Sequence, residues 1–195
     1  IKIAIIGKPN VGKSSIVNAF VGEDRVIVSD IAGTTRDSID TPFERDGIRY
    51  TLIDTAGIRR RSKVTDDVEK FSVVRAVAAI ERCDVALLVI DATEGVTEQD
   101  KKIAGIAHEA GKGIVVVVNK WDLVTKETNT MRDFERQVKG ELVFMSYAPV
   151  LFISALKGQR LPQVLETARS VAEMRAMRVS TGQLNDLIQD AMMMN

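Results

Sequence analysis

The sequence predicts an α/β fold built on an open, mostly parallel six-stranded sheet, with one antiparallel edge strand and helices on both faces. Short apolar segments rich in β-branched residues alternate with helical segments, which is typical of β-α-β units. A proline-containing segment precedes Asp46-Gly47, a dipeptide that favours a hairpin. The chain has 195 residues, 45% of them hydrophobic, which is enough to bury one core.

Five segments are predicted to be buried parallel strands because they are short and nearly continuous apolar runs. They are 1–6, 49–54, 84–90, 113–119 and 149–154. Segment 39–46 alternates more and contains a proline, so we expect it to form the edge strand, paired as a hairpin with 49–54. The helices are expected at 13–21, 66–82, 97–110, 130–143 and 161–178.

One α/β domain is therefore expected over residues 1–178. Residues 179–195 follow it with a capping residue, Ser180 or Thr181, and then apolar residues at helical spacing, at 184, 187, 188, 191 and 192. We interpret this segment as the start of a helix that belongs to a truncated C-terminal domain.

Composition excludes several classes of function. There are 27 basic and 27 acidic residues, so no overall charge directs the protein to nucleic acid or membrane. Cys83 is the single cysteine and is expected to be a buried structural thiol, and His108, the single histidine, is expected to be a solvated helix-end residue. The longest apolar run, 114–118, is too short to span a bilayer. A reducing, cytosolic compartment is expected.

The segment GKPNVGKS (7–14) follows the first strand and opens the first helix. Its glycines would let the backbone wrap a polyphosphate, while N–H groups and the helix dipole supply positive potential. Lys13 is expected to reach the terminal phosphates and the Ser14 hydroxyl to bind Mg²⁺. The alternative is a structural glycine-rich turn. Nucleotide contacts are assigned to Gly7, Asn10, Val11, Gly12, Lys13, Ser14 and Ser15.

The tetrapeptide NKWD ends the strand at 113–119, at the sheet edge where α/β proteins bind ligands. The Asp122 carboxylate matches the N1–H and 2-amino groups of guanine, which adenine lacks. Lys120 is expected to lie along the base, and Asn119 to tie this loop to the phosphate loop. Trp121 is expected to pack in the core.

The tetrapeptide SALK ends the last strand at the same edge. Here the Ala155 N–H is expected to donate to guanine O6, with Ser154 and Leu156 beside it and Lys157 bordering the base. A tetrapeptide is a weak signal by itself, so SALK supports guanine binding mainly because it lies at the expected edge of the sheet.

The motif DTAG ends the strand at 49–54. Asp54 is expected to hold Mg²⁺ through water and the Gly57 N–H to meet the γ-phosphate. In the upstream loop AGTTRD, Thr34 and Thr35 compete as the metal ligand, and we favour Thr35. A loop held by the γ-phosphate and released on hydrolysis is a switch.

Together these motifs resemble the P-loop GTPases of the translation-factor-related class, with a Ras-like fold, and most closely the Der (EngA) family of bacterial ribosome-assembly GTPases. The resemblance runs through GKPNVGKSS, VSDIAGTTRDSIDT, DTAGIRRRSKV and VVNKWD and covers nearly all of the chain. It implies GTP/GDP and Mg²⁺ as ligands, a bacterial cytoplasmic location, and the large ribosomal subunit as partner. The basic DTAG extension is similar to that of the second of two tandem GTPase domains. LNDLIQDAM resembles the opening of the helix that leads into a KH-like domain.

Ile58 follows DTAG, where many switch GTPases carry a water-orienting glutamine, and its hydrocarbon cannot do that work. The related potassium-activated GTPases place a K⁺ ion near the β,γ-bridge, held by an asparagine at the position of Asn10. The hypothesis is therefore K⁺-stimulated hydrolysis with Asn10 as a K⁺ ligand, and Lys13, Thr35 and Gly57 as the other catalytic groups. The alternative is that Asn10 only shapes the loop turn.

The basic run Arg59, Arg60, Arg61 and Lys63 leaves three alternatives open: a solvated charged surface, a contact for RNA or a neighbouring domain, and an arginine acting on the phosphate in cis. The first two are favoured, because these side chains follow the glycine and would move with the loop.

The predicted function is a slow, Mg²⁺-dependent GTPase switch, with loops at 30–40 and 57–70 ordered by GTP. A nucleotide-gated interaction module with little intrinsic hydrolysis is the alternative. A small P-loop kinase, which would need a lid with arginines and an acceptor site, is disfavoured by the guanine-binding patterns NKWD and SALK.

Overall fold

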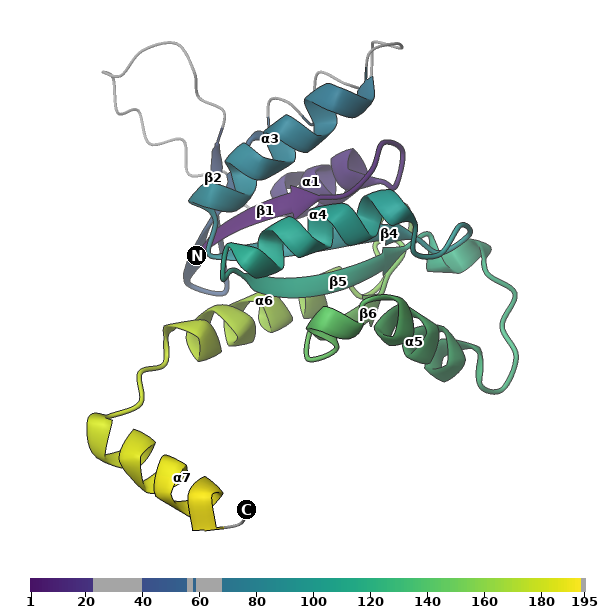
Figure 1. Cartoon of the computed structure of the whole chain (residues 1–195). Helices are drawn as coiled ribbons and strands as arrows, with labels where there is room; N and C mark the ends of the chain where they lie inside the picture. The colour runs from purple at the N-terminus through teal and green to yellow at the C-terminus, as the bar shows by residue number, and fades with distance from the viewer. Residues whose placement is uncertain (23–39, 56–57, 59–67, 194–195) are drawn as a thin grey trace, which may run out of the picture.

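The computed structural model describes residues 1–22, 40–55, 58 and 68–193. Its centre is a six-stranded sheet in the order β2-β3-β1-β4-β5-β6 (Figure 1). The strands are β1 (Lys2–Ile6), β2 (Thr41–Arg45), β3 (Ile48–Ile53), β4 (Val85–Asp91), β5 (Gly113–Asn119) and β6 (Val150–Phe152). β2 pairs with β3 in antiparallel register, and the other neighbours are parallel. The predicted sheet, with its antiparallel edge strand, is confirmed.

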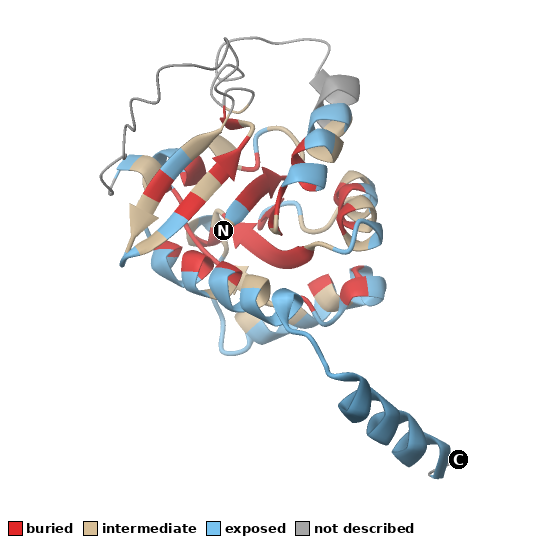
Figure 2. Ribbon diagram, turned by 90° about the vertical axis from the view of Figure 1, so that its left-hand side faces the viewer, coloured by how far each residue is buried: buried red, intermediate tan, exposed pale blue. Residues whose placement is uncertain are grey.

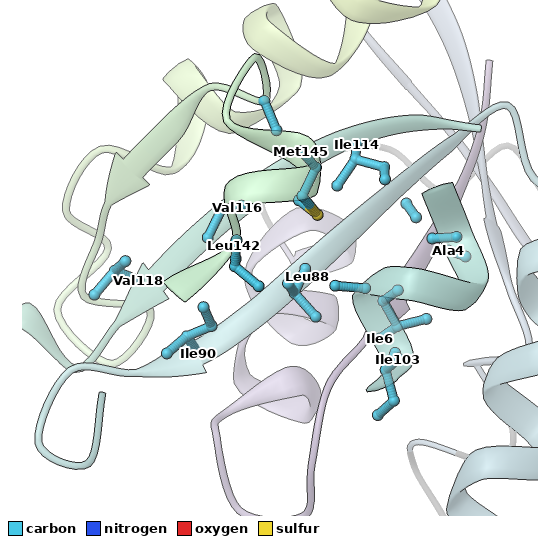
Figure 3. Close-up of a cluster of buried hydrophobic side chains, with 14 of the residues drawn as sticks. Ala4, Ile6, Leu88, Ile90, Ile103, Ile114, Val116, Val118, Leu142 and Met145 are labelled. Carbon is cyan, nitrogen blue, oxygen red and sulfur yellow. The ribbon is translucent and has the colours of Figure 1, made fainter. Parts of the chain in front are cut away.

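Helices cover both faces of this sheet. They are α1 (Lys13–Gly22), α3 (Val68–Arg82), α4 (Glu98–Glu109), α5 (Thr130–Glu141), α6 (Leu161–Ala176) and α7 (Thr181–Met193), with short 3₁₀ turns η2 (Trp121–Leu123) and η3 (Val143–Met145). The strands alternate their side chains between two buried clusters, as a period of two requires. In β4, Ala86, Leu88 and Ile90 join the cluster under α3, α4 and α5, as Figure 3 shows for Leu88 and Ile90.

The opposite face of β4 supplies Val85, Leu87 and Val89 to a second cluster, which is closed by residues of α1 and α6. All seven residues of β4 and all seven of β5 are buried. Such strands carry no polar face, which explains why the sequence shows continuous apolar runs there instead of an alternating pattern.

Element boundaries differ from the predicted ones mainly at carboxyl ends. β6 ends at Phe152 and not at 154, because Ser154 leaves the ladder and forms an isolated bridge with Gln159. α5 ends at Glu141 and not at 143, where the chain tightens into η3 and buries Met145. α6 ends at Ala176, since Met177 adopts an extended conformation.

The sheet order places the site. β1 lies between β3 and β4, so the chain leaves β1 toward one side of the sheet and later returns to the other. Ligands of open α/β sheets bind at such a switch point, outside the carboxyl ends of the strands. The loops after β1, β3, β5 and β6 therefore converge, and the register pairs Asp91 at the end of β4 with Asn119 at the end of β5.

α7 follows α6 and differs from the other helices in having no buried residue (Figure 2). Ser180 begins it: its hydroxyl accepts from the Gln183 N–H, and the Gln183 side chain accepts in return from the Ser180 N–H. This capping box selects Ser180 over Thr181 as the capping residue. The apolar face with Leu184, Leu187 and Ile188 is exposed.

Two isolated residues have clear roles. Cys83 is buried, and burial raises the pKa of its thiol to about 11, so it stays neutral and packs as a hydrophobic side chain, as expected. His108 lies in the last turn of α4, as expected, but it is half-buried instead of fully solvated. Its Nδ1 lies 2.9 Å from the Tyr147 hydroxyl, and Phe144 packs edge-on against its ring. Among the described helices none is long and apolar enough to cross a membrane.

We expect Leu88→Ala to lower the free energy of unfolding by about 2–5 kcal/mol, because Leu88 is fully buried at the centre of the sheet and its loss leaves a cavity. Leu187→Ala is the matched control. Its side chain is 67% exposed on α7, so the change should stay within about 0.5 kcal/mol. Denaturant unfolding followed by circular dichroism measures both. Equal effects of the two substitutions would contradict the assignment of the core.

Candidate functional site

The phosphate loop connects β1 to α1, and its glycines are required by close approaches. Gly7 and Gly12 have φ values of 138° and 99°. A Cβ atom on Gly12 would lie 2.1 Å from Asn119 Nδ2, and one on Gly7 would lie 2.4 Å from the Val89 carbonyl oxygen. Any side chain at these positions would push the loop away from the strands, so the sequence motif has a steric cause here.

Lys13 stands at the start of α1 and turns its ammonium group back over the loop. The group donates to the carbonyl oxygens of Gly7, at 2.8 Å, and Lys8. The N–H groups of Gly12 and Ser14 lie at the start of α1, where the first N–H groups of a helix have no partner within the helix. Together with the start of a helix, these groups make a concave, positive site that fits a polyphosphate. Ser15 lies exposed on the first turn of α1.

Ser14 and Ile58 are in direct contact. The Ser14 hydroxyl, the predicted Mg²⁺ ligand, donates to the Ile58 carbonyl oxygen at 3.0 Å. The Ile58 side chain is half-buried and packs against the cluster that contains Val11, Ile16 and Val17. Ile58 is therefore used in packing between the phosphate loop and the segment after β3, and its backbone supplies the polar contact.

Asp54 lies at the end of β3 in a left-handed conformation, with φ at 57°. Its N–H donates to Asp40 Oδ1 at 3.1 Å, and Asp40 in turn pairs with Arg82 at the end of α3. The metal-ligand candidate is thus held at the predicted edge. Thr34 and Thr35, Gly57, and the basic run Arg59–Arg61 with Lys63 lie outside the described residues, as do most of the two predicted switch loops.

Asn119 joins three loops. Its side chain is 3% exposed, and Nδ2 donates to the Val11 carbonyl oxygen at 2.8 Å, which is the tie to the phosphate loop that the sequence predicts. At the other end of the amide, Oδ1 accepts from the Ala155 N–H at 3.0 Å. This second bond was not predicted.

The hydrogen bond from Ala155 to Asn119 changes the expected recognition of guanine O6. The sequence predicts that the Ala155 N–H donates to guanine O6, but in the structure it donates to Asn119 Oδ1. To bind guanine as predicted, this N–H would have to donate to both oxygens. The neighbouring Leu156 N–H donates to no described residue, and the Leu156 side chain is 86% exposed. The turn that starts at Ser154 therefore presents two adjacent N–H groups for a base carbonyl.

Asp122 is held as a charged acceptor. A hydrogen bond from the Ser154 hydroxyl, and then the nearby Lys157 ammonium, outweigh desolvation and keep the pKa of the Asp122 carboxyl below its usual value. Lys157 Nζ lies 3.7 Å from Asp122 Oδ2. Ser154 also accepts from the Lys157 N–H at 3.3 Å, so the two loops fix one another. Trp121 between them packs against Phe152 with 4.5 Å between ring centroids, and its predicted role in packing is confirmed.

Sequence reasoning missed Asp91 at the end of β4. Burial would raise the pKa of this carboxyl, but hydrogen bonds from Lys120 and Thr93 outweigh burial and lower it. Lys120 Nζ lies 2.5 Å from Asp91 Oδ2. Lys120, whose stem was expected over the base, is anchored in this way in a left-handed conformation with φ at 62°. The sequence did contain a signal for Asp91: it is an acidic residue at the end of a strand that is predicted to be buried, next in the chain before the strand that ends in NKWD.

The comparisons with known proteins agree with this geometry. Residues 2–120 match a family described as 50S ribosome-binding GTPase. The chain is 64% identical over 195 residues to the GTPase Der of Alkaliphilus metalliredigens, and 60% identical over 194 residues to that of Caldanaerobacter subterraneus subsp. tengcongensis. In each case the whole chain is covered. The chain spans 44% of the length of these relatives.

Solved structures show the same fold. Era in complex with MgGDPNP and nucleotides of 16S ribosomal RNA superposes with a TM-score of 0.64 at 30% identity, over 85% of this chain and 54% of that one. Translation elongation factor SelB from Methanococcus maripaludis, in complex with the GTP analogue GPPNHP, gives a TM-score of 0.67 at 20% identity, over 92% and 35% of the two chains. The second likeness concerns the fold alone.

We expect Asp122→Asn to lower the preference for GDP over XDP by about 100-fold or more, because an amide at this position can donate to the O2 carbonyl that xanthine carries in place of the guanine 2-amino group. Competition binding with the two diphosphates measures the preference. The exposed Asp133→Asn in α5 serves as the control and should leave it unchanged. An unaltered preference in the Asp122 variant would mean that another group reads the base.

We expect Ser154→Ala to move the acid limit of GDP binding to higher pH. The Ser154 hydroxyl stabilises the Asp122 carboxylate and lowers its pKa, so the wild-type group stays charged at lower pH than it would without this hydrogen bond. Without the hydroxyl, the pKa rises, and binding is lost earlier as the pH falls. The exposed Ser170→Ala in α6 is the control. GDP titrations between pH 3.5 and 7 measure this shift. Identical pH profiles for the wild type and Ser154→Ala would disprove the role of Ser154.

Proposed function

The chain belongs to the family of 50S ribosome-binding GTPases, and from this premise we propose that it is the GTP-binding and GTP-hydrolysing switch domain of a factor for assembly of the large ribosomal subunit. The observation that carries the proposal is the side chain of Asn119, which links the phosphate loop to the guanine loop through the Val11 carbonyl. In support of the proposal, this link joins the phosphate loop to the loop that carries the Asp122 carboxylate, whose side chain is 8% exposed.

The domain organisation is part of this proposal. Residues 1–178 form the GTPase domain, which resembles the second GTPase domain of Der, and residues 179–195 begin a further, KH-like domain. In support, α7 has its own capping box at Ser180 and contributes no buried residue to the rest of the chain. The large ribosomal subunit and the other domains would be partners of the longer protein, in the bacterial cytoplasm.

The residues present fit GTP and Mg²⁺. The tight approach at Gly12 and the N–H groups of the phosphate loop suit the β- and γ-phosphates, with Lys13 placed to neutralise them. The Ser14 hydroxyl and the Asp54 carboxylate, with Thr35, would hold Mg²⁺, an ion that prefers oxygen ligands and takes the rest of its shell from phosphate and water. When bound, Mg²⁺ supplies charge stabilisation at the bridging phosphates. The described residues contain no cluster of three or more His, Cys, Asp or Glu side chains that would form a site for another metal.

The chain's own residues account for a slow reaction. Lys13 binds the terminal phosphates, and the Gly57 N–H would contact the γ-phosphate. Asn119, Lys120 and Asp122 orient the base. Ile58 packs against the core and does not orient water, so positive charge near the β,γ-bridge has to come from another source.

A K⁺ ion held by Asn10 is the proposed source. Asn10 is exposed, and its side-chain amide bonds to no described residue, so its oxygen is available as a ligand. Its left-handed backbone, with φ at 64°, also fits the plainer alternative, because asparagine tolerates this conformation better than most residues. The two roles differ in whether removal of the amide abolishes K⁺ stimulation.

A nucleotide-gated interaction module is the second candidate. It is favoured by the packing of Ile58, which leaves the usual position of the water-orienting side chain filled by hydrocarbon. In that case GTP and GDP would set the placement of the segment after DTAG, including the basic run Arg59–Arg61, toward RNA or a neighbouring domain.

We expect GTP turnover of the chain with Mg²⁺ to be at least about tenfold faster in KCl than in NaCl at one ionic strength, because a positioned cation stabilises the charge that develops on the β,γ-bridge. Asn10→Ala should remove most of this difference, whereas Asn129→Ala, at the exposed start of α5, should retain it. Phosphate release measures the rates.

The outcomes separate the candidates. K⁺ stimulation that survives Asn10→Ala would show that Asn10 only shapes the turn. Equal and near-zero rates in both salts, beside tight GDP binding, would favour the interaction module. Lack of binding to guanine nucleotides would disprove the proposed function.

A further inference from the structure

The turn after β4, Asp91–Gly95, here named the linking turn, contacts both the phosphate loop and the loop that contains Lys120. The linking turn contains none of the GTP-binding motifs of the sequence. Its backbone is closed by bonds from the Glu94 and Gly95 N–H groups to the Asp91 carbonyl, at 3.2 and 2.9 Å. The Ala92 N–H donates to the Asn119 carbonyl at 2.9 Å, which joins the turn to the end of β5.

Asp91 divides its two carboxylate oxygens between the turn and the guanine loop. Oδ1 accepts from the Thr93 N–H at 2.9 Å and from the Thr93 hydroxyl at 2.7 Å. Oδ2 accepts from Lys120 Nζ at 2.5 Å. The Asp91 side chain is 4% exposed and the Lys120 side chain 33%, so the carboxylate end of this ion pair is buried, and a charge-assisted hydrogen bond holds Lys120.

Glu94 extends from the same turn to the phosphate loop. Its carboxylate pairs with the ammonium group of Lys8; the Lys8 side chain is 13% exposed and the Glu94 side chain 55%. The carbonyl of Lys8 is one of the two that hold Lys13. The pair therefore connects the linking turn to the part of the phosphate loop that positions the phosphate-binding lysine.

The linking turn is itself well anchored. On one side it continues β4, which is buried throughout. On the other side it leads into α4, which begins with a capping box in which Thr97 donates its hydroxyl and N–H to Asp100 Oδ2 at 2.6 and 3.0 Å. A rigid element that carries two lysine–carboxylate pairs, one to each loop, is suited to fix the loops relative to each other.

We propose that the linking turn couples recognition of the base to recognition of the phosphates, with Asp91 and Glu94 as positioning residues that act through Lys120 and Lys8. The inference rests on the proposed guanine-nucleotide binding and adds residues to it. A change on the phosphate side of the turn alters discrimination at the base, and a change on the guanine side alters discrimination at the β-phosphate.

Three ligands separate these effects in the intact chain with Mg²⁺. IDP lacks the 2-amino group, so the preference for GDP over IDP reports contact with Asp122. GMP lacks the β-phosphate, so the preference for GDP over GMP reports the phosphate loop. Competition against a fluorescent GDP analogue measures all three affinities.

We expect Glu94→Gln to reduce the GDP-over-IDP preference by about threefold to tenfold, although Glu94 is near the phosphate loop, because contacting groups couple by such factors. Asp91→Asn should reduce the GDP-over-GMP preference to a similar extent. Thr93→Val removes one bond to Asp91 and should give a smaller loss of the same kind, while Thr93→Ser keeps the hydroxyl and should restore the wild-type preference. Glu98→Gln, which breaks an exposed pair with Lys101 in α4, is the matched control.

A role in stability alone would lower the melting temperature and weaken all three ligands by the same factor, which leaves the preferences unchanged. That result, or unchanged affinities in every variant, would overturn the inference about the linking turn. The proposed function would still be supported if the wild type prefers GDP over IDP. Equal binding of GDP and IDP by the wild type would overturn both.

Discussion

The buried side-chain amide of Asn119 holds together the loops after β1, β5 and β6. Its nitrogen donates to the Val11 carbonyl and its oxygen accepts from the Ala155 N–H, so both ends of a group that is 3% exposed are satisfied. An unpaired polar group at this depth would cost stability, and hence each loop is held against the amide. The absence of a side chain at Gly12 follows from the same constraint, because a Cβ there would overlap the Asn119 nitrogen.

The sheet gives this amide its position. β4 and β5 are buried on both faces and paired over seven residues, which brings Asn119 beside Asp91 and both to the carboxyl edge. The two hydrophobic clusters on opposite faces prevent a shift of one residue, since such a shift would exchange the side chains that face each cluster. Rigid central strands thus carry the polar groups, and the chemistry lies in the loops that follow them.

Ile58 has a structural role at a position where many GTPases carry a residue that orients water. Its side chain packs against residues of the phosphate loop and α1, and its carbonyl accepts from the Ser14 hydroxyl. This contact joins Ile58, in the segment after β3, to the hydroxyl proposed to bind Mg²⁺. The sequence position that many GTPases use to orient water therefore serves here to connect two loops, and charge stabilisation has to be supplied differently.

The sequence by itself determined the order of strands and helices, the antiparallel edge strand, and the phosphate and guanine motifs with their places at strand ends. These depend on local periodicity and on residue types that few other functions require. The pairs Lys8–Glu94 and Lys120–Asp91 were decided by the tertiary structure, because they join residues 86 and 29 positions apart through the register of parallel strands. The second bond of Asn119, to Ala155, and the contact of His108 with Tyr147 have the same cause. A single sequence shows which side chains carry charge or hydrogen-bonding groups, whereas the packing of the sheet decides which of them meet.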